Sequence, residues 1–183
     1  MSDKSFLARP SAAFRASYLD ALREGFAMGG DPGLEPEAID AIDVDFATHL
    51  ASLDKDGQTP FTHEGRLLQS VPSNTFWLIE SDTFIGAVSI RARADTHILA
   101  HFGGHVGFGI RPSMRRRGHG TRQLALALAI CRGIGISLVR LSCDEDNVGS
   151  RRIIETNGGL LLRRCPPAWY ADHPYLLYEI PLV

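Results

Sequence analysis

The chain has 183 residues, of which 44% are hydrophobic and 22% are charged. This composition excludes a disordered chain and favours a single domain over residues 1–183. The longest apolar run, residues 124–131, is too short to span a bilayer, and the first residues show no signal-peptide pattern. Three cysteines without a CxxC pair exclude a disulfide framework and a zinc ribbon. We therefore expect a cytoplasmic protein that does not bind membranes.

The net charge of −2 hides an asymmetry along the chain. Residues 1–66 carry six basic and twelve acidic side chains, whereas residues 107–164 carry eleven arginines and four acidic side chains. Arginine is the side chain best suited to bidentate contacts with phosphate. No aromatic residues interleave with these arginines, as binding of single-stranded nucleic acid would require. The pattern favours a local anion site over a nucleic-acid-binding surface.

The first 74 residues form a helical and variable part of the predicted domain. Apolar residues at helical spacing predict one helix over residues 12–28 and a second, with an acidic solvated face, over residues 35–53. Residues 54–74 are rich in turn formers and show no clear period. We expect a long loop there.

From residue 75 onward the pattern favours strands and helices in a mixed order. Strands alternate with helices only in the second half, which favours an α/β fold of the α+β type over a doubly wound parallel sheet. The predicted strands cover residues 75–80 and 84–91 (a hairpin), 105–111, 137–143, 159–164 and 175–182, and the predicted helices cover residues 118–133 and 150–157.

An arginine-glycine turn leads into the first of these two helices. Pro112 ends a strand, the basic residues 115–117 follow, and Gly118 and Gly120 remove side chains where the backbone must come close to another group. The first turn of a helix presents unpaired N–H groups at the positive end of the helix dipole, which is an anion site. The alternative is an exposed basic turn with no ligand. A P-loop and a dinucleotide-binding GxGxxG motif are both absent.

Two blocks of sequence resemble the GNAT superfamily of N-acetyltransferases. Arg115-x-x-Gly118-x-Gly120, after a strand that ends in Ile110-Arg111-Pro112, is similar to the acetyl-CoA signature of that superfamily. Residues 142–159, which contain Asn147 and end in two glycines, resemble its second block. The resemblance covers residues 75–183.

The resemblance implies a mixed, mostly antiparallel sheet with flanking helices, whose central strands splay to admit acetyl-CoA. The strand before the turn is expected to be bulged, and the acetyl group is expected to pass to a primary amine by direct attack. A backbone N–H near Ile110 would polarise the acetyl carbonyl. The implied cofactor-binding residues are Phe108, Gly109, Ile110, Arg115, Arg116, Arg117, Gly118, His119, Gly120, Thr121, Asn147, Ser150 and Arg152.

The acid and the base are less defined than the cofactor site. Many GNAT enzymes carry a tyrosine seven residues after the asparagine, where this chain has Ile154. Some relatives carry a serine at the position of Ser150 instead, which makes Ser150 the candidate acid, with helix capping as the alternative. Asp144 is the preferred candidate base, and Glu80 is the second candidate. The alternative for each carboxylate is an ordinary solvated group.

Other motifs support weaker hypotheses. His97, His101 and His105 recur every four residues, but two glycines interrupt a helix before the third, so we expect no metal site. Cys143 is expected to be a buried strand residue and not a nucleophile.

The acceptor is expected to be a small-molecule or peptide amine, and the acidic first half weakly favours a cationic one. Loops over residues 28–74 and 92–104 would shape its site. Trp169, Tyr170 and Tyr175 either line that site or pack the last strand. The sequence leaves open whether the chain forms a homodimer. The alternative function is a non-catalytic module that binds acyl-CoA, which the absence of the family tyrosine favours.

Overall fold

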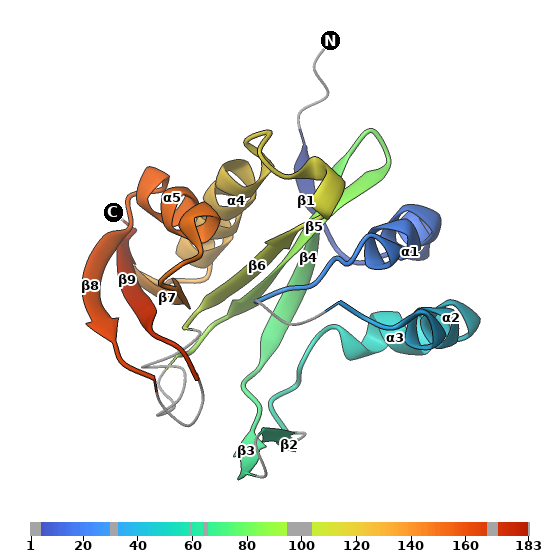
Figure 1. The fold of residues 1–183 in the computed structure, drawn as a ribbon, viewed down its shortest axis with the longest axis horizontal. Coiled ribbons are helices and arrows are strands. Elements are labelled where there is room, and N and C mark those ends of the chain that lie inside the picture. The colour runs from blue at the N-terminus through green and yellow to red at the C-terminus, as the bar shows by residue number, and fades with distance from the viewer. Residues whose placement is uncertain are drawn as a thin grey trace.

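The computed structural model describes residues 5–29, 33–58, 60–63, 66–94, 104–167 and 172–182. Its strands form two main antiparallel sheets that lie side by side (Figure 1). The first sheet has the order β1-β4-β5-β6 and the second the order β7-β9-β8, with a separate hairpin of β2 and β3. The strands are β1 (Phe6–Ala8), β2 (Pro60–His63), β3 (Arg66–Gln69), β4 (Ser73–Glu80), β5 (Thr83–Arg91), β6 (Val106–Ile110), β7 (Leu138–Asp144), β8 (Leu160–Cys165) and β9 (Tyr175–Pro181).

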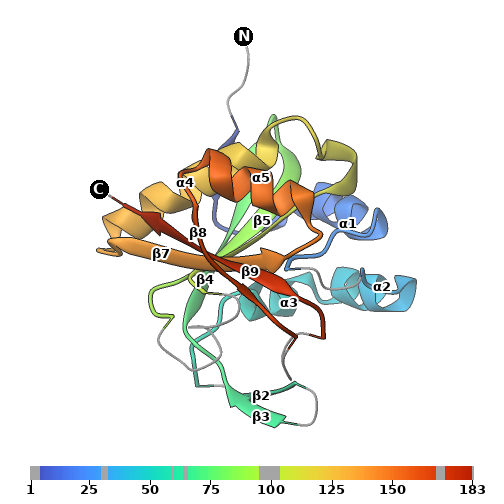
Figure 2. The ribbon, with the colours of Figure 1, turned by 60° about the vertical axis from the view of Figure 1, so that its left-hand side comes forward.

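Helices cover both faces of the first sheet. Figure 2 shows α4 and α5 together above the strands. In Figure 1 these two helices lie on one side of β4, β5 and β6, and α1, α2 and α3 lie on the other. The helices are α1 (Arg15–Arg23), α2 (Pro36–Val44), α3 (Phe46–Ser52), α4 (His119–Gly133) and α5 (Val148–Thr156), with single 3₁₀ turns at Ala12–Phe14 and Pro112–Met114. Among the described residues, no helix has the length and apolar character that crossing a membrane requires.

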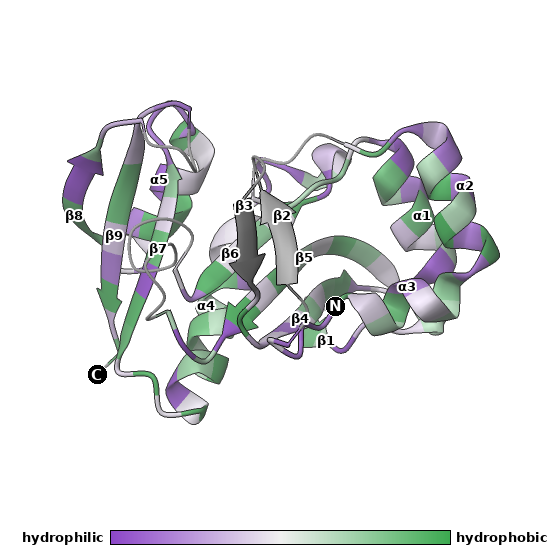
Figure 3. Ribbon diagram, turned by 90° about the horizontal axis from the view of Figure 1, so that it is seen from below, coloured by the Kyte–Doolittle hydropathy of each residue, from purple (hydrophilic) through white to green (hydrophobic). Residues whose placement is uncertain are grey.

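Each face of the first sheet packs into its own core. On one face, Val88 and Ile90 of β5 pack with Leu124 of α4, and this core continues into the second sheet. On the other face, the rings of Tyr18 and Trp77 stack with centroids 4.5 Å apart. Bands of hydrophobic and hydrophilic residues alternate along α1 and α2, as Figure 3 shows. The sheet therefore lies between two apolar layers, which fixes the face to which each β5 residue points.

The two sheets meet at one end of β6 and β7 and separate at the other. The backbone N–H of His105 donates to the carbonyl of Arg140 at 2.7 Å, and Gly104 forms an isolated bridge with Leu141. Beyond this point β6 pairs only with β5, and β7 pairs only with β9, among the residues that the structure describes. The expected splay of the central strands is confirmed.

The splay does not require a bulge in β6, so that expectation is wrong. β6 pairs with β5 in continuous register from Val106 to Ile110. The register shift in this sheet lies between Leu78 and Ile79 of β4. β6 separates from β7 because their backbone contacts stop at its first residues, not because its own ladder is interrupted.

The second half of the chain follows the sequence prediction, and the first half departs from it. Each predicted strand and helix after residue 75 is present, with its ends shifted by two residues or fewer. The helix predicted over residues 12–28 ends at Arg23, because Gly25 takes a left-handed φ of 83° and turns the chain. The helix predicted over residues 35–53 is interrupted at Asp45, whose side chain caps α3 by accepting from the N–H of Thr48.

Two features of the fold were not predicted. Residues 54–74, expected to be a loop, contain the β2–β3 hairpin and the start of β4. β1 adds to the edge of the first sheet by pairing with β4. The side chain of Arg122 on α4 donates to the carbonyl and hydroxyl of Ser5, which ties this edge to the helix above it.

Candidate functional site

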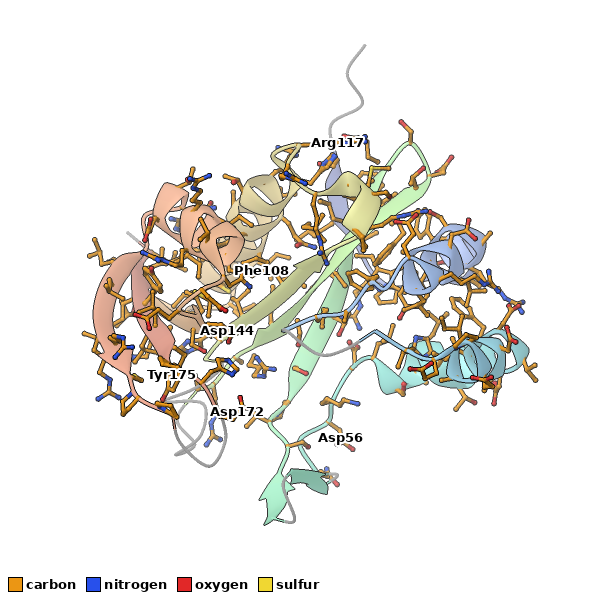
Figure 4. The ribbon with its side chains drawn as sticks, in the orientation of Figure 1. Asp56, Phe108, Arg117, Asp144, Asp172 and Tyr175 are labelled. Atoms are coloured by element: carbon orange, nitrogen blue, oxygen red, sulfur yellow. The ribbon has the colours of Figure 1, made fainter. Side chains whose placement is uncertain are left out.

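The space between β6 and β7 is a cleft of about 830 Å³. Strand β6 forms one wall. The last residues of β7 and the start of α5 form the other. In the view of Figure 4, Phe108 of β6 lies between Arg117 of the turn and Asp144 at the end of β7. The residues that line the cleft are Gly25, Ala27, Gly29, Arg91, residues 106–110, Arg115, Arg116, Gly120, residues 142–144, Asn147, Gly149, Ser150 and Ile153.

Every second residue of β6 points its backbone N–H and C=O groups into this cleft. The carbonyl of His105 and the N–H of Arg111 bond to β5, so the odd-numbered residues between them face β5 as well. Phe108 and Ile110 therefore point their backbone groups away from β5, toward the gap. The carbonyl of Ile110 accepts from Nε of Arg115 at 3.1 Å. The N–H groups of Phe108 and Ile110 are left for an extended ligand.

Gly109 is a glycine because another segment crosses β6 at this position. A Cβ atom on Gly109 would lie 2.5 Å from the carbonyl oxygen of Ala27 and 3.3 Å from Cα of Met28. The segment between α1 and α2 thus passes directly over the strand. The glycine reflects close backbone approach, as its position within a strand predicts.

A salt bridge holds the end of α1 against the turn that follows β6. Nε of Arg111 donates to Oε1 of Glu24 at 2.8 Å, and the N–H of Ser113 donates to Oε2 at 3.2 Å. The hydrogen bond from Arg111, which is largely buried, lowers the pKa of Glu24 to about 2. The turn is therefore anchored before the helix begins.

The N-terminus of α4 presents unpaired backbone N–H groups. Gly118 is the N-cap, with a φ of 83° that favours glycine, and Arg116 also has a positive φ of 59°. Arg122 is the first residue of α4 whose N–H reaches a carbonyl of the preceding turn, that of Gly118 at 3.1 Å. The amides of residues 116–121 precede this bond, and they lie at the positive end of the helix dipole. Several converging donors of this kind suit the adjacent oxygens of a diphosphate.

The three arginines of the turn differ in their positions and contacts. Arg115 and Arg116 line the cleft, and Arg115 also holds the carbonyl of Ile110. Arg117 is exposed and contacts the sulfur of Met114 at 3.7 Å. His119 and Thr121, in the first turn of α4, do not line the cleft. They would therefore contribute only their backbone amides to a bound diphosphate.

Gly120 lines the cleft, but its missing side chain serves helix packing. A Cβ atom on Gly120 would lie 2.5 Å from Cδ1 of Ile153 on α5. The missing side chain of Gly120 therefore makes room for α5, and the expected contact of its backbone with the cofactor stays a prediction.

The start of α5 places Asn147 and Ser150 on the cleft. Oδ1 of Asn147 accepts from the N–H of Ser150 at 3.0 Å, so Asn147 is the N-cap of α5. The interpretation of Ser150 as the cap is therefore wrong, and its hydroxyl is not committed to that role. Arg152 is exposed and does not line the cleft. Ile154, at the tyrosine spacing, is fully buried in the core.

Asp144 lies at the end of β7 and forms a hydrogen bond with a histidine that the sequence did not single out. Nε2 of His173 lies 2.8 Å from Oδ1 of Asp144, and its Nδ1 lies 2.5 Å from Oδ1 of Asp172. The hydrogen bonds with these two carboxylates raise the pKa of His173, and the one with Asp144 has the larger effect. Twenty-nine residues separate Asp144 from His173, so no local pattern indicated the pair. Glu80, the second candidate base, does not line the cleft.

Cys143 also lines the cleft, as a poor nucleophile. Burial raises the pKa of its thiol to about 12. The thiolate is therefore scarce at neutral pH. Cys143 is a strand residue, as expected, but it is half-buried and not fully buried.

The remaining sequence hypotheses fall partly outside the described residues. His97, His101, Trp169 and Tyr170 all lie outside them. Nδ1 of His105 accepts from the N–H of Arg140 at 3.0 Å, and the described part of the chain holds no cluster of three or more metal-ligating side chains. Tyr175 is buried with Leu177 and Cys165 and packs the last strand.

The diverging strands and the open first turn of α4 define the class of acyl-CoA-dependent transferases. The profile of the acetyltransferase (GNAT) family matches residues 42–158, which is more than half of the chain. The chain belongs to this family, and it is an acetyl-CoA-dependent acetyltransferase. A search of curated protein sequences finds no match.

Solved structures support the same fold. The chain is similar to RimJ of Mycobacterium smegmatis in complex with a CoA disulfide, with a TM-score of 0.66 and 14% identity over 96% of this chain and 80% of that one. It is similar to the ribosomal L7/L12 α-N-protein acetyltransferase RimL in complex with CoA, with a TM-score of 0.62 and 12% identity over 99% and 96%. The microcin C7 self-immunity acetyltransferase MccE, in complex with acetyl-CoA and AMP, has a TM-score of 0.63 and 10% identity over 98% and 93%.

Proposed function

We propose that the protein transfers the acetyl group of acetyl-CoA to a primary amine by direct attack of the amine nitrogen. The observation that carries this proposal is the unpaired first turn of α4, which opens on the cleft between β6 and β7. Solved relatives with CoA or acetyl-CoA bound support the choice of co-substrate. Relatives that acetylate protein amino groups support the choice of an amine.

The cleft would hold acetyl-CoA along its whole length. The amides of residues 116–121 bind the diphosphate, with Arg115 and Arg116 beside them. The backbone of β6 from Phe108 to Ile110 pairs with the pantetheine arm, as an additional strand would. The amide of Asn147, whose oxygen is used as the helix cap, is left to donate to that arm.

Acetyl-CoA supplies an activated acetyl group as a thioester. In the proposed reaction a bond forms between the acceptor nitrogen and the acetyl carbon, and the bond from that carbon to sulfur breaks. The N–H of Ile110 donates to the acetyl oxygen as negative charge develops on it. The nitrogen loses a proton to Asp144, directly or through water. The leaving thiolate takes a proton from Ser150, whose hydroxyl regains one from water.

Release of CoA from acetyl-CoA in the presence of a panel of amines tests this proposal. The thiol is followed with a chromogenic disulfide, and binding of acetyl-CoA is measured separately by calorimetry. We expect saturable acetyl-CoA binding and thiol release that depends on at least one amine. Absence of both would overturn the proposal. Tight binding without release for any amine would instead support a non-catalytic acyl-CoA-binding module.

A further inference from the structure

Arg91 is a cation in the cleft that the mechanism above does not use. It is the last residue of β5, where Val88 and Ile90 point into the core beneath α4. Because side chains alternate along a strand, Arg91 points to the opposite face of the sheet. There its Nη1 lies 4.0 Å from the position of a Cβ atom on Gly107 of β6. The guanidinium therefore extends over β6 and lines the cleft.

The charge of Arg91 has no carboxylate partner among the described residues. Its Nη1 donates to the backbone carbonyl of Gly104 at 3.3 Å. No acidic side chain in the described ranges lies within ion-pair distance. Burial lowers the pKa of the guanidinium. A desolvated cation whose acceptor among the described residues is a neutral carbonyl is costly unless an anion joins it.

The other charged groups that line the cleft have assigned partners. Arg115 and Arg116 adjoin the first turn of α4, where the diphosphate is proposed to bind, and Asp144 pairs with His173. Arg91 contacts Gly107, three residues before the Ile110 end of β6, which is about 10 Å along the strand. The diphosphate on the turn is thus too far to neutralise Arg91. Among the described residues no carboxylate is placed to neutralise Arg91, so an anionic group of another molecule would fit there.

We propose that Arg91 binds an anionic group of the acceptor, so that the acceptor is an amine with a carboxylate or phosphate group. This inference rests on the proposed function, which places the acceptor amine in this cleft. Arg91 and Asp144 line the same cleft, so one would hold the anionic group while the other takes the proton from the amine. An amino acid, a peptide or a phosphorylated small amine has this combination of groups.

The acidic first half of the chain does not argue against an anionic acceptor. Glu37 and Asp40 of α2 are exposed, and neither lines the cleft. Among the described residues that line the cleft, the charge without a carboxylate partner is positive, that of Arg91. The sequence-based preference for a cationic acceptor considered charge along the chain and not its position.

Matched pairs of acceptors test the inference. The pairs are amino acids with their amides, and O-phosphoethanolamine with ethanolamine. We expect one anionic class to show kcat/KM at least about tenfold above its neutral partner, because a hydrogen bond between two charged groups is stronger than one between neutral groups. The two kinds of pair distinguish carboxylate from phosphate. Arg91→Met should abolish the preference through KM, and Arg91→Lys should retain part of it.

Two controls separate this inference from the proposed function. Acetyl-CoA affinity should be unchanged in Arg91→Met, and Arg132→Met, an exposed arginine in the last turn of α4, should keep the preference. If neutral amines are acetylated as well as anionic ones, the inference fails and the proposed function stands. If no amine supports thiol release, calorimetric titration of the same pairs into the CoA-bound protein decides the inference independently. Equal binding of the anionic and neutral members would overturn it.

Discussion

Gly120 of α4 faces Ile153 of α5 so closely that a Cβ atom on the glycine would lie 2.5 Å from Cδ1 of the isoleucine. This contact sets how near the two helices approach each other. Both residues line the cleft, and α5 also carries Asn147 and Ser150. The spacing of two helices therefore determines where the side chains of the second wall lie.

Gly120→Ala should destabilise the fold by about 1–3 kcal/mol, because the added methyl overpacks the contact with Ile153. Denaturant unfolding measures the loss. The double variant Gly120→Ala with Ile153→Val removes the opposing Cδ1 atom and should recover most of the stability. A single variant as stable as the natural protein would show that the helices can separate at no cost.

Asn147 has two separable roles, as the cap of α5 and as a proposed donor to acetyl-CoA. Asn147→Ala should lose about 1 kcal/mol of stability, because the N–H of Ser150 loses its acceptor. Asn147→Ser should keep the cap and hence the stability, since serine caps helices nearly as well. Unfolding curves of the two variants measure this difference.

Acetyl-CoA titrations of the same two variants measure the second role. Serine lacks the amide N–H group, so both variants should bind acetyl-CoA more weakly than the natural protein. If Asn147→Ser binds acetyl-CoA with unchanged affinity, the asparagine is only a cap.

Ser150→Ala should lower kcat by about tenfold or more and leave acetyl-CoA affinity unchanged, if its hydroxyl protonates the leaving thiolate. The effect is limited because a thiol with a pKa near 8.5 is a moderately good leaving group at neutral pH. Steady-state kinetics and calorimetry separate the two quantities. Ser137→Ala, outside the cleft and just before β7, is the matched control. Turnover of Ser150→Ala equal to that of the control would reject the role.

His173 should titrate above its ordinary pKa of 6.5, because Asp144 and Asp172 favour the charged imidazolium. Its contribution to stability is then complete below about pH 6.5 and is lost as pH rises through the higher folded-state pKa. NMR titration of the ring resonances measures the midpoint. Asp144→Asn should lower it more than Asp172→Asn, since the Asp144 hydrogen bond has the larger effect.

His105 is an internal control in the same spectra. Burial lowers its pKa below 6.5, so its midpoint should lie on the other side of that value. A His173 midpoint at or below that of His105 would contradict the pairing with Asp144.

The part of the site that lies in one continuous segment could be predicted from the sequence. Pro112, the arginines and Gly118 specify a strand end, a turn and a helix start by local backbone preferences alone, and the structure has all three. The helix predicted from Ser150 is also present, although it begins at Val148 with Asn147 as its cap. Such features depend on neighbouring residues, which a sequence displays directly.

Features that depend on distant segments could not be predicted in this way. His173 meets Asp144 only because β9 pairs with β7, and Arg91 reaches the cleft only because β5 pairs with β6. The contact of Gly120 with Ile153 is likewise a tertiary one, which the local sequence does not display. The segment that forms the β2–β3 hairpin lacks a clear alternation of apolar residues, so the sequence predicts a loop there.

The crystal structure of the protein with CoA tests the central claim most directly. We expect the diphosphate within hydrogen-bond distance of the amides of residues 116–121, and the pantetheine arm along Phe108–Ile110 between β6 and β7. CoA bound elsewhere, or a diphosphate held by side chains while those amides face only solvent, would contradict the account.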